Sequence, residues 1–427
     1  MEQKNHFWSR IDKKVFFIGG IVCLIFVLWA VIWPAEAANT FDHCLNFFTQ
    51  KFGWLYLLVV TCFVVFLVWL CCSKYGKIPL GKDGEKPEYS TLSWFFMLFA
   101  AGMGIGLVFW SVAEPISHFA DPPFGTANTV EAAETAMKYS FMHWGLHPWA
   151  CFGVVGLPLA YFQFRKGKPA LLSTCLIPLI GEEKANGVLG SIVNVLAVFA
   201  TVFGVATSLG LGAMQINSGL HYVFGVPTGN IPLIIIVVTV TLLFISSAVS
   251  GISKGIKILS DTNMVIAAVL LVFVLIVGPT LFILNFFISA LGDYLNTLFS
   301  TCTWTDAFST NEGWLGRWTI FYWAWWISWG PFVGGFIARI SKGRTIREFI
   351  IGTLVCPVLL SFVFIGIMGG SALYGDINGL TDIAGAMADD VSYALFALLG
   401  SMPLAKVTSI IALLLISVFF ITSADSS

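Results

Sequence analysis

Charged side chains are scarce in this sequence. Asp, Glu, Lys and Arg make up 11% of the 427 residues, whereas a soluble globular domain carries about 25%. So few charges cannot cover the surface of a water-soluble core, which excludes a soluble fold. Basic and acidic residues also balance to a net charge of −1, which excludes the strongly basic character of many nucleic-acid-binding proteins.

Apolar and aromatic residues are abundant instead. Hydrophobic residues make up 58% of the chain, which contains 16 Trp and 39 Phe. An apolar run of about 20 residues crosses a bilayer as a helix. The sequence therefore predicts an all-α polytopic membrane protein with ten spans, at residues 15–33, 53–72, 92–113, 139–164, 187–214, 231–249, 264–288, 318–340, 349–374 and from 404 to the end.

The few charges are distributed unevenly between the loops. Eighteen of the 22 Lys and Arg residues lie in the N-terminal segment or in every second loop after it. Cytoplasmic loops of membrane proteins carry the excess of basic residues. We therefore expect the N-terminus to be cytoplasmic.

Three short motifs resemble enzyme sites but lack the structural context that an enzyme needs. Residues 251–255 match the nucleophile-elbow pattern, which requires a preceding strand and a His partner. His143 and His147 have the spacing of a zinc pair, but no third ligand is evident. Residues 102–106 are rich in glycine, yet no strand precedes them as it does in a nucleotide-binding loop. None of the three predicts an enzyme.

A glycine-rich segment interrupts the third apolar run. Gly102, Gly104 and Gly106 lie in its middle, and each weakens a helix by up to about 1 kcal/mol. Close packing against another helix is one explanation, since Gly102 and Gly106 form a GxxxG pair. The alternative, which we favour, is unwound backbone lining a cavity, where carbonyl groups bind a cation and a helix N-terminus binds an anion.

The eighth run carries an unusual concentration of aromatic residues, between Phe321 and Pro331. At 100° per residue, one arc of about 160° holds five rings, those of Tyr322, Trp323, Trp325, Trp326 and Trp329. An aromatic belt at the lipid interface is the alternative, but the cluster begins inside its span and precedes Gly330-Pro331, a pair typical of a helix break. The segment has no acidic residue, and ring faces attract a desolvated quaternary ammonium by about 2 kcal/mol or more.

Taken together, these segments resemble the betaine/carnitine/choline transporter family, and most closely its Na⁺-coupled glycine betaine transporters. The resemblance rests on the glycine segment, on Glu114-Pro115, on His143-Trp144-Gly145, and above all on residues 318–329 with their continuation at 338–348. Residues 422–426 match as well. The resemblance therefore covers the chain from the third run to its end.

The family resemblance implies a leucine-transporter-type fold, in which two inverted five-helix repeats follow two extra helices. Residues 1–91 would form the cytoplasmic N-terminus and two peripheral helices, and 92–289 the first repeat with its broken third span. An extracytoplasmic segment at 290–316 would connect it to the first three helices of the second repeat, at 317–427. A second repeat as long as the first would run past residue 427, so we expect the sequence to lack two final spans.

The resemblance also implies which residues bind substrate. The family holds a trimethylammonium head in an aromatic box, at positions that correspond to Trp144, Trp149, Phe152, Trp323, Trp325, Trp326 and Trp329. Phe152 departs from the Tyr that is usual in betaine carriers, so a hydroxyl is lost and the ring face remains. The substrate carboxylate would meet the backbone of Ala101, Gly102, Met103 and Gly104.

Sodium is the coupling ion that the resemblance implies, and no other cofactor is expected. Carbonyl oxygens of Ala100, Met103 and Phe419 and the hydroxyls of Thr422 and Ser423 would bind it, since alkali cations prefer hard oxygen ligands. The expected function is Na⁺-coupled uptake of glycine betaine, or of a close analogue such as choline, by alternating access. The expected protein is a homotrimer in the bacterial inner membrane.

Three other functions stay open at this point. A sodium-independent exchanger of carnitine-like substrates belongs to the same class. A cation channel or an intramembrane metalloenzyme would belong to another.

Overall fold

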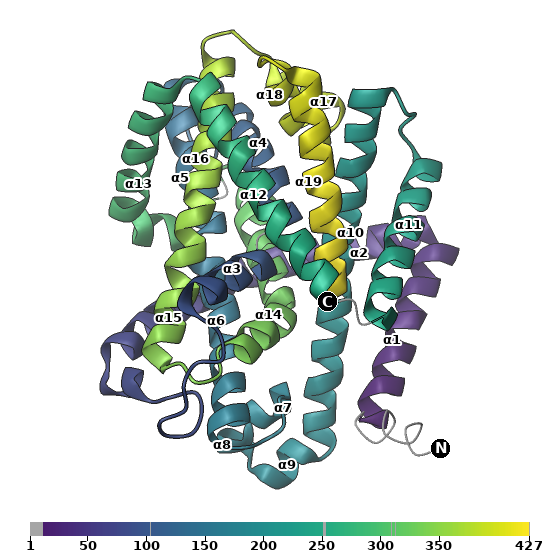
Figure 1. Cartoon of the computed structure of the whole chain (residues 1–427), viewed down its shortest axis with the longest axis vertical. Helices are drawn as coiled ribbons and strands as arrows, with labels where there is room; N and C mark the ends of the chain where they lie inside the picture. The colour runs from purple at the N-terminus through teal and green to yellow at the C-terminus, as the bar shows by residue number, and fades with distance from the viewer. Residues whose placement is uncertain (1–11, 103, 251–252, 309, 312, 427) are drawn as a thin grey trace. The chain divides into compact units, whose positions relative to one another are not determined.

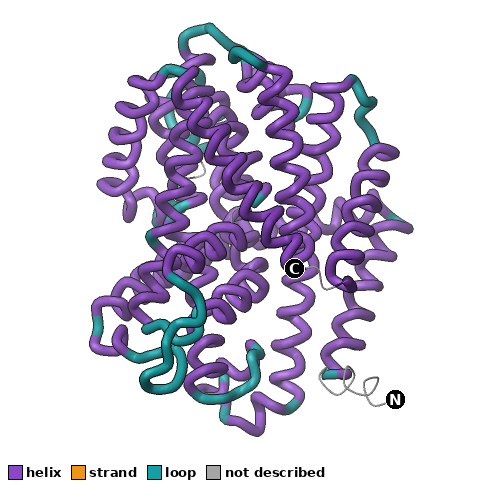
Figure 2. The backbone as a smooth tube through the Cα atoms, viewed as in Figure 1, coloured by secondary structure: helices purple, strands orange, loops and turns teal. Residues whose placement is uncertain are grey.

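The computed structural model describes residues 12–102, 104–250, 253–308, 310–311 and 313–426. All regular secondary structure in this part of the chain is helical (Figure 2). The chain divides into two compact units, each built from three separate segments. Unit 1 consists of Met1–Trp94, Pro148–Gly204 and Leu315–Leu354, and unit 2 of Phe95–His147, Val205–Trp314 and Val355–Ser427.

Unit 1 is organised around the long helix α2, which packs against α1, α14 and α15. Asp12 caps α1 by accepting hydrogen bonds from the backbone N–H groups of Lys14 and Val15, and Pro34 occupies the first turn of α2, where no N–H partner is needed. The helices of unit 1 are α1 (Lys13–Ile32), α2 (Pro34–Cys72), η2 (Lys74–Lys77), the start of α3 (Thr91–Gly102), most of α6 (Leu146–Ala160), η3 (Tyr161–Arg165), α7 (Leu172–Cys175), α8 (Ile177–Ile180), α9 (Glu182–Asn186), the first half of α10 (Val188–Phe224), η4 (Gly316–Ile320), α14 (Phe321–Ile340) and α15 (Ile346–Leu354).

Helix α4 lies at the centre of unit 2, where it packs against α5, α16, α17, α18 and α19 (Figure 1). A Cβ atom added at Gly369 would lie 2.7 Å from the ring of Pro115, so glycine allows α16 to approach α4 this closely. The helices of unit 2 are the rest of α3 and α10, the start of α6, α4 (Ile105–Ala120), α5 (Val130–Trp144), α11 (Asn230–Ser250), α12 (Ser253–Val277), α13 (Thr280–Cys302), α16 (Cys356–Ile377), α17 (Ile383–Asp389), η5 (Val391–Tyr393), α18 (Ala394–Gly400) and α19 (Ala405–Ser426).

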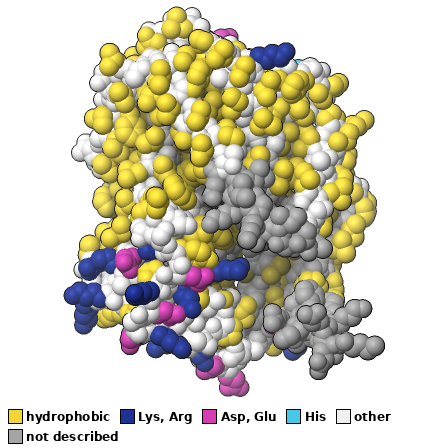
Figure 3. Space-filling view, in the orientation of Figure 1, with side chains coloured by type: hydrophobic (Ala, Val, Ile, Leu, Met, Phe, Trp, Pro, Cys, Tyr) yellow, Lys and Arg dark blue, Asp and Glu magenta, His cyan; other side chains and the backbone are white. Residues whose placement is uncertain are grey.

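Many of these helices are apolar enough to cross a bilayer. Six helical segments in the described residues have the required length and composition, at Lys13–Ile32, Pro34–Cys72, Val130–Arg165, Val188–Phe224, Thr280–Cys302 and Ile346–Ile377. Large apolar side chains also face outward, and hydrophobic atoms cover most of the face drawn in Figure 3. Such exposure suits contact with lipid. The prediction of an all-helical polytopic membrane protein is confirmed.

One predicted span is wrong. The apolar run at 264–288 is not a single helix, because α12 ends at Val277 and α13 begins at Thr280. Gly278 and Pro279 lie between them; proline has no N–H to donate and its ring clashes with a preceding helical turn. Hydropathy alone does not reveal this interruption. Helix α13 continues to Cys302, so the predicted boundary between the first repeat and the connecting segment, after residue 289, falls inside a helix. The repeat architecture and the other domain limits stay predictions.

The charged loops of unit 1 are fastened together. The backbone N–H of Leu80 donates to the carbonyl of Arg344 (2.7 Å), and the N–H of Gly343 donates to the carbonyl of Leu80 (2.8 Å). Lys342 pairs with Glu85 at 2.9 Å. The Arg165 guanidinium donates a hydrogen bond to Asp83 and holds the pKa of that carboxyl below its usual range. Figure 3 shows Lys, Arg, Asp and Glu side chains gathered at the lower end of the face drawn, the end at which Figure 1 labels α7, α8 and α9.

Arg344 also attaches the start of α3 to this group of loops. Its guanidinium carbon lies 3.9 Å from the centroid of the Trp94 ring, a distance at which a cation is attracted to the ring face. It donates to the carbonyl of Tyr89 at 2.9 Å, and the Trp94 indole N–H donates to the Ser341 hydroxyl at 3.1 Å. Three loops that the charge pattern assigns to the cytoplasm are therefore held at one end of unit 1.

Candidate functional site

Helix α14 carries a stack of aromatic rings. The rings of Trp325 and Trp326 are nearly parallel, with centroids 4.7 Å apart and an interplanar angle of 10°. Tyr322 stacks on Trp326 at 5.8 Å, and Trp329 meets Trp325 edge-on at 6.4 Å. The prediction that the rings share one face of a helix is confirmed for these four and stays a prediction for Trp323. Trp323 is also buried.

Helix α6 adds two rings to this stack within unit 1. The Phe152 ring meets Trp326 edge-to-face, with centroids 6.0 Å apart and an interplanar angle of 86°. Trp149 in turn meets Phe152 at 5.7 Å and 87°. We call these six residues the aromatic cluster: Trp149, Phe152, Tyr322, Trp325, Trp326 and Trp329. Five of the seven residues predicted to form the aromatic box thus belong to one cluster.

Glycines hold α6 and α14 close enough for this contact. A Cβ atom added at Gly334 would lie 2.9 Å from the Cβ atom of Val155 and 3.0 Å from the backbone nitrogen of Gly156. A Cβ atom added at Gly156 would lie 2.8 Å from the carbonyl oxygen of Gly334. Small residues allow this approach between apolar helices. The glycine contact therefore fixes the spacing of the two helices that carry the cluster.

The aromatic cluster presents hydrogen-bond donors as well as ring faces. Among the described residues, no acceptor lies within hydrogen-bond distance of the buried indole nitrogens of Trp149, Trp325 and Trp329. Neither α6 nor α14 contains an acidic residue. The aromatic cluster can therefore bind a cation through its ring faces and an anion through its N–H groups, and neither helix supplies a carboxylate.

The predicted helix break at Gly330-Pro331 is wrong. Helix α14 continues without interruption from Phe321 to Ile340 and includes Pro331. Proline removes one backbone hydrogen bond, and a helix in an apolar environment can retain its remaining bonds because no water competes for them. The irregularity lies before the helix instead, where η4 makes a π-helical turn at Gly316–Ile320.

The predicted break in the third apolar run is confirmed. Helix α3 ends at Gly102 and α4 begins at Ile105, and Gly104 has backbone angles outside the helical region (φ −56°, ψ −110°). Met103 and the side chains of Ala100 and Ala101 lie outside the described residues. The predicted roles of Ala101 to Gly104 in substrate binding stay predictions.

The predicted sodium ligands all belong to unit 2. Phe419 is buried in α19, and α19 packs against α4, the helix that begins at the break. The side chains of Thr422 and Ser423 lie outside the described residues. Their part in binding sodium, like that of Ala100 and Met103, stays a prediction.

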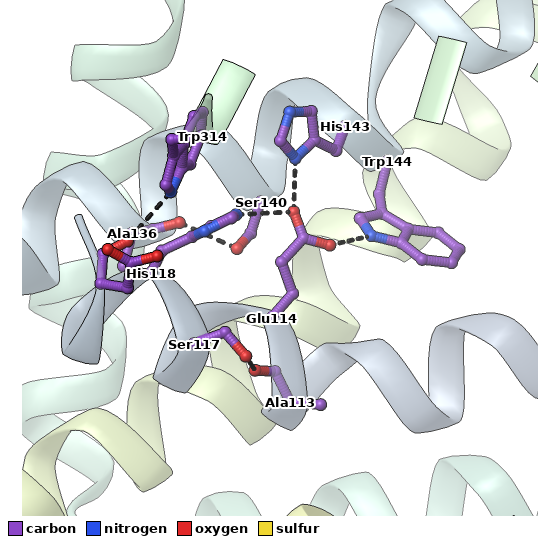
Figure 4. A network of polar contacts seen from close by, with 10 residues as sticks. Ala113, Glu114, Ser117, His118, Ala136, Ser140, His143, Trp144 and Trp314 are labelled. Carbon is purple, nitrogen blue, oxygen red and sulfur yellow. Dashed lines mark hydrogen bonds and ion pairs between the residues drawn. The ribbon is translucent and has the colours of Figure 1, made fainter. Parts of the chain in front are cut away.

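A buried polar cluster lies in unit 2, around Glu114 of α4, and the sequence did not predict that its residues meet (Figure 4). Its Oε1 atom lies 2.6 Å from Nδ1 of His143 and 3.2 Å from Nε2 of His118. Its Oε2 atom accepts a hydrogen bond from the indole N–H of Trp144 at 2.6 Å. All four side chains are at most 1% exposed. We call these four residues the Glu114 cluster.

The Glu114 cluster shows which partner His143 has. One ligand atom each from Glu114, His118 and His143 lie within 4.8 Å of one another, the arrangement of a potential metal site. Both carboxylate oxygens, however, already accept hydrogen bonds, which is how a buried carboxylate is normally satisfied. His143 therefore pairs with Glu114 and not with His147 as a zinc pair. The sequence did contain a sign of this cluster, since Glu114 and His118 lie four residues apart in an apolar helix.

Comparison with known proteins gives consistent results. A family model described as betaine/carnitine/choline family transporter matches residues 14–427. The chain is 52% identical over 417 residues to the glycine betaine transporter OpuD of Bacillus subtilis, covering 97% of this chain and 81% of that protein. It is 47% identical over 420 residues to a probable glycine betaine transporter of Desulfitobacterium hafniense (98% and 84% covered). It is 44% identical over 421 residues to an ectoine/hydroxyectoine transporter of Virgibacillus pantothenticus (98% and 83% covered).

Proposed function

Because this chain belongs to the betaine/carnitine/choline transporter family, we propose that it takes up glycine betaine or a closely related quaternary-ammonium osmolyte. Membership in the family makes the chain a transporter and not an enzyme. The two relatives named as glycine betaine transporters, at 52% and 47% identity, support this choice of substrate.

The aromatic cluster is the observation that carries the proposal. A trimethylammonium group cannot donate a conventional N–H hydrogen bond, so it binds best to the faces of aromatic rings. Stacked Trp325 and Trp326, with Phe152 edge-on to Trp326, offer such faces in a buried and uncharged setting. The buried indole N–H groups of Trp149, Trp325 and Trp329 suit the carboxylate at the other end of glycine betaine.

We also propose that Na⁺ drives uptake by alternating access. The break between α3 and α4 supports this, because unwound backbone in an apolar region can expose carbonyl oxygens as cation ligands. The packing of α19 against α4 supports it too, since both elements carry predicted sodium ligands or lie next to them. Bound sodium would stabilise the interrupted backbone and so favour substrate binding.

Uptake into proteoliposomes tests substrate and coupling together. We expect labelled glycine betaine to accumulate with an inward Na⁺ gradient and not with K⁺ at equal ionic strength, because Na⁺ is the proposed coupling ion. An excess of unlabelled choline or ectoine, added in separate reactions, ranks these substrates by competition. Equal accumulation with Na⁺ and K⁺ would identify a sodium-independent exchanger, and ectoine competing better than glycine betaine would move the substrate to another class.

Topology and assembly complete the proposal. We propose a homotrimer in the bacterial inner membrane with a cytoplasmic N-terminus. The loops at one end of unit 1 support this orientation, because the ion pairs of Arg165 with Asp83 and of Lys342 with Glu85 hold together segments rich in Lys and Arg. Labelling of single cysteines introduced at Asp83 and Asn311 in intact cells would report the orientation, and light scattering of the purified protein its oligomeric state.

A further inference from the structure

Helix α10 contacts the aromatic cluster through a glycine. Gly204 is buried and is the last residue of unit 1 on this helix, and Trp329 of α14 lies against it in the same unit. A Cβ atom added at Gly204 would lie 2.5 Å from Cδ1 of Trp329 and 3.2 Å from its Nε1. The edge of the indole that carries the N–H group therefore packs directly on the backbone of α10.

Trp329 has little freedom to move away from Gly204. Its ring meets Trp325 edge-on, with centroids 6.4 Å apart and an interplanar angle of 71°, and it meets Phe332 at 6.0 Å and 85°. Ser328 lies beside α10 as well, with its Oγ atom 3.1 Å from the same added Cβ atom, and its hydroxyl donates to the carbonyl of Trp325 at 2.7 Å. The orientation of the Trp329 indole is therefore set jointly by α10 and by two rings of its own helix.

The N–H group on this edge is available to a ligand. Nε1 of Trp329 is buried, and no atom of the described residues accepts a hydrogen bond from it. An indole nitrogen can only donate, and a buried donor without an acceptor is unfavourable, so a ligand that brings an acceptor gains affinity here. A methyl group at Gly204 would crowd this nitrogen, because 3.2 Å is a distance at which an oxygen atom accepts such a bond.

We propose that Gly204 is a specificity-determining residue, which favours substrates with a carboxylate by keeping the N–H edge of Trp329 uncovered and correctly oriented. This inference rests on the proposed function, in which the ring faces of the aromatic cluster bind the trimethylammonium group and its indole N–H groups bind the carboxylate. Choline has the same cationic head as glycine betaine but an alcohol where glycine betaine has the carboxylate. A site that loses the donor for the carboxylate should therefore lose its preference for glycine betaine, while the ring faces still bind the shared head.

The test compares the binding of glycine betaine and of choline to the same variants. We expect Gly204→Ala to raise the Kd for glycine betaine about tenfold, the effect of losing one charge-assisted hydrogen bond, and the Kd for choline less than about threefold. Trp329→Phe removes the N–H group and keeps a ring, so we expect the same preferential loss. In the double variant Gly204→Ala/Trp329→Phe, the ratio of the two Kd values should equal that of Trp329→Phe alone, because the first change acts through the N–H group that the second removes.

Stability and a second glycine separate specificity from folding. Each Kd is measured by titration on purified protein whose melting temperature is recorded in parallel. Gly210→Ala serves as the matched control, since Gly210 lies on the same helix and a Cβ atom added there meets nothing within 4 Å. We expect it to bind both compounds as the unaltered protein does. If Gly204→Ala does not fold, Trp329→Phe and the double variant decide the question, because a smaller ring can turn aside from the methyl group.

Four results would overturn the inference. The first is an equal loss of affinity for both compounds in folded Gly204→Ala, which would give the glycine a role in packing alone; the second is unchanged affinity for both. The third is a Trp329→Phe variant that keeps the preference for glycine betaine, and the fourth is a double variant whose preference falls further than that of Trp329→Phe. All four are distinct from failure of the proposed function, in which the unaltered protein would bind neither compound.

Discussion

Replacing Trp326 with alanine is expected to abolish binding of glycine betaine. Trp326 is at the centre of the aromatic cluster, where it contacts Trp325, Tyr322 and Phe152. The change removes a ring face worth about 2 kcal/mol to a desolvated cation and disturbs the neighbouring rings, so the loss of affinity should exceed about 30-fold. Titration of purified protein and Na⁺-driven uptake both measure it.

Two further variants show whether the ring itself is responsible. Trp326→Phe keeps a smaller ring, and we expect it to retain part of the affinity. Trp54→Ala removes a tryptophan from the same unit that is 56% exposed, and we expect it to bind normally. Unchanged affinity in Trp326→Ala would place the trimethylammonium group elsewhere and remove the main support for the proposed substrate.

The second large effect is expected at Gly334. An alanine there would place its Cβ atom 2.9 Å from Val155 and 3.0 Å from the Gly156 nitrogen. Backbone atoms cannot turn aside as a flexible side chain can, so α6 and α14 must separate. We expect a loss of about 1–3 kcal/mol of stability, together with weaker glycine betaine binding, because Phe152 and Trp326 would move apart. Melting temperature and Kd are the measurements.

Gly335 provides a matched control one residue away. A Cβ atom added there meets nothing within 4 Å, and alanine is favoured over glycine in a helix by up to about 1 kcal/mol. We therefore expect Gly335→Ala to be neutral or slightly stabilising and to bind normally. Equal effects at Gly334 and Gly335 would contradict the close contact between α6 and α14.

Features that depend on neighbours along the chain were predictable from the sequence. Apolar runs predicted the helices, and the glycines at Gly102 and Gly104 predicted the break between α3 and α4, because both follow from local backbone and solvation preferences. Spacing along one helix predicted that Tyr322, Trp325, Trp326 and Trp329 share a face. The involvement of Trp149 and Phe152 followed from family resemblance, not from local pattern.

The failures share a different cause. Hydropathy predicted one span across Gly278-Pro279, although α12 ends just before this pair. Gly330-Pro331 suggested a helix break, although α14 continues through it. A Gly-Pro pair leaves both outcomes accessible, and tertiary packing decides between them. Glu114 and His143 lie 29 residues apart, and only the packing of α4 on α5 shows that they meet.

The aromatic cluster has a consequence for how the protein responds to its surroundings. An aspartate or glutamate that holds a cation loses its charge when it binds a proton, but the electron distribution of an indole ring does not change between acid and neutral solution. The affinity of the cluster for glycine betaine should therefore stay constant between acid and neutral pH. Any dependence of transport on acidity would then originate in ionisable side chains and not in these rings.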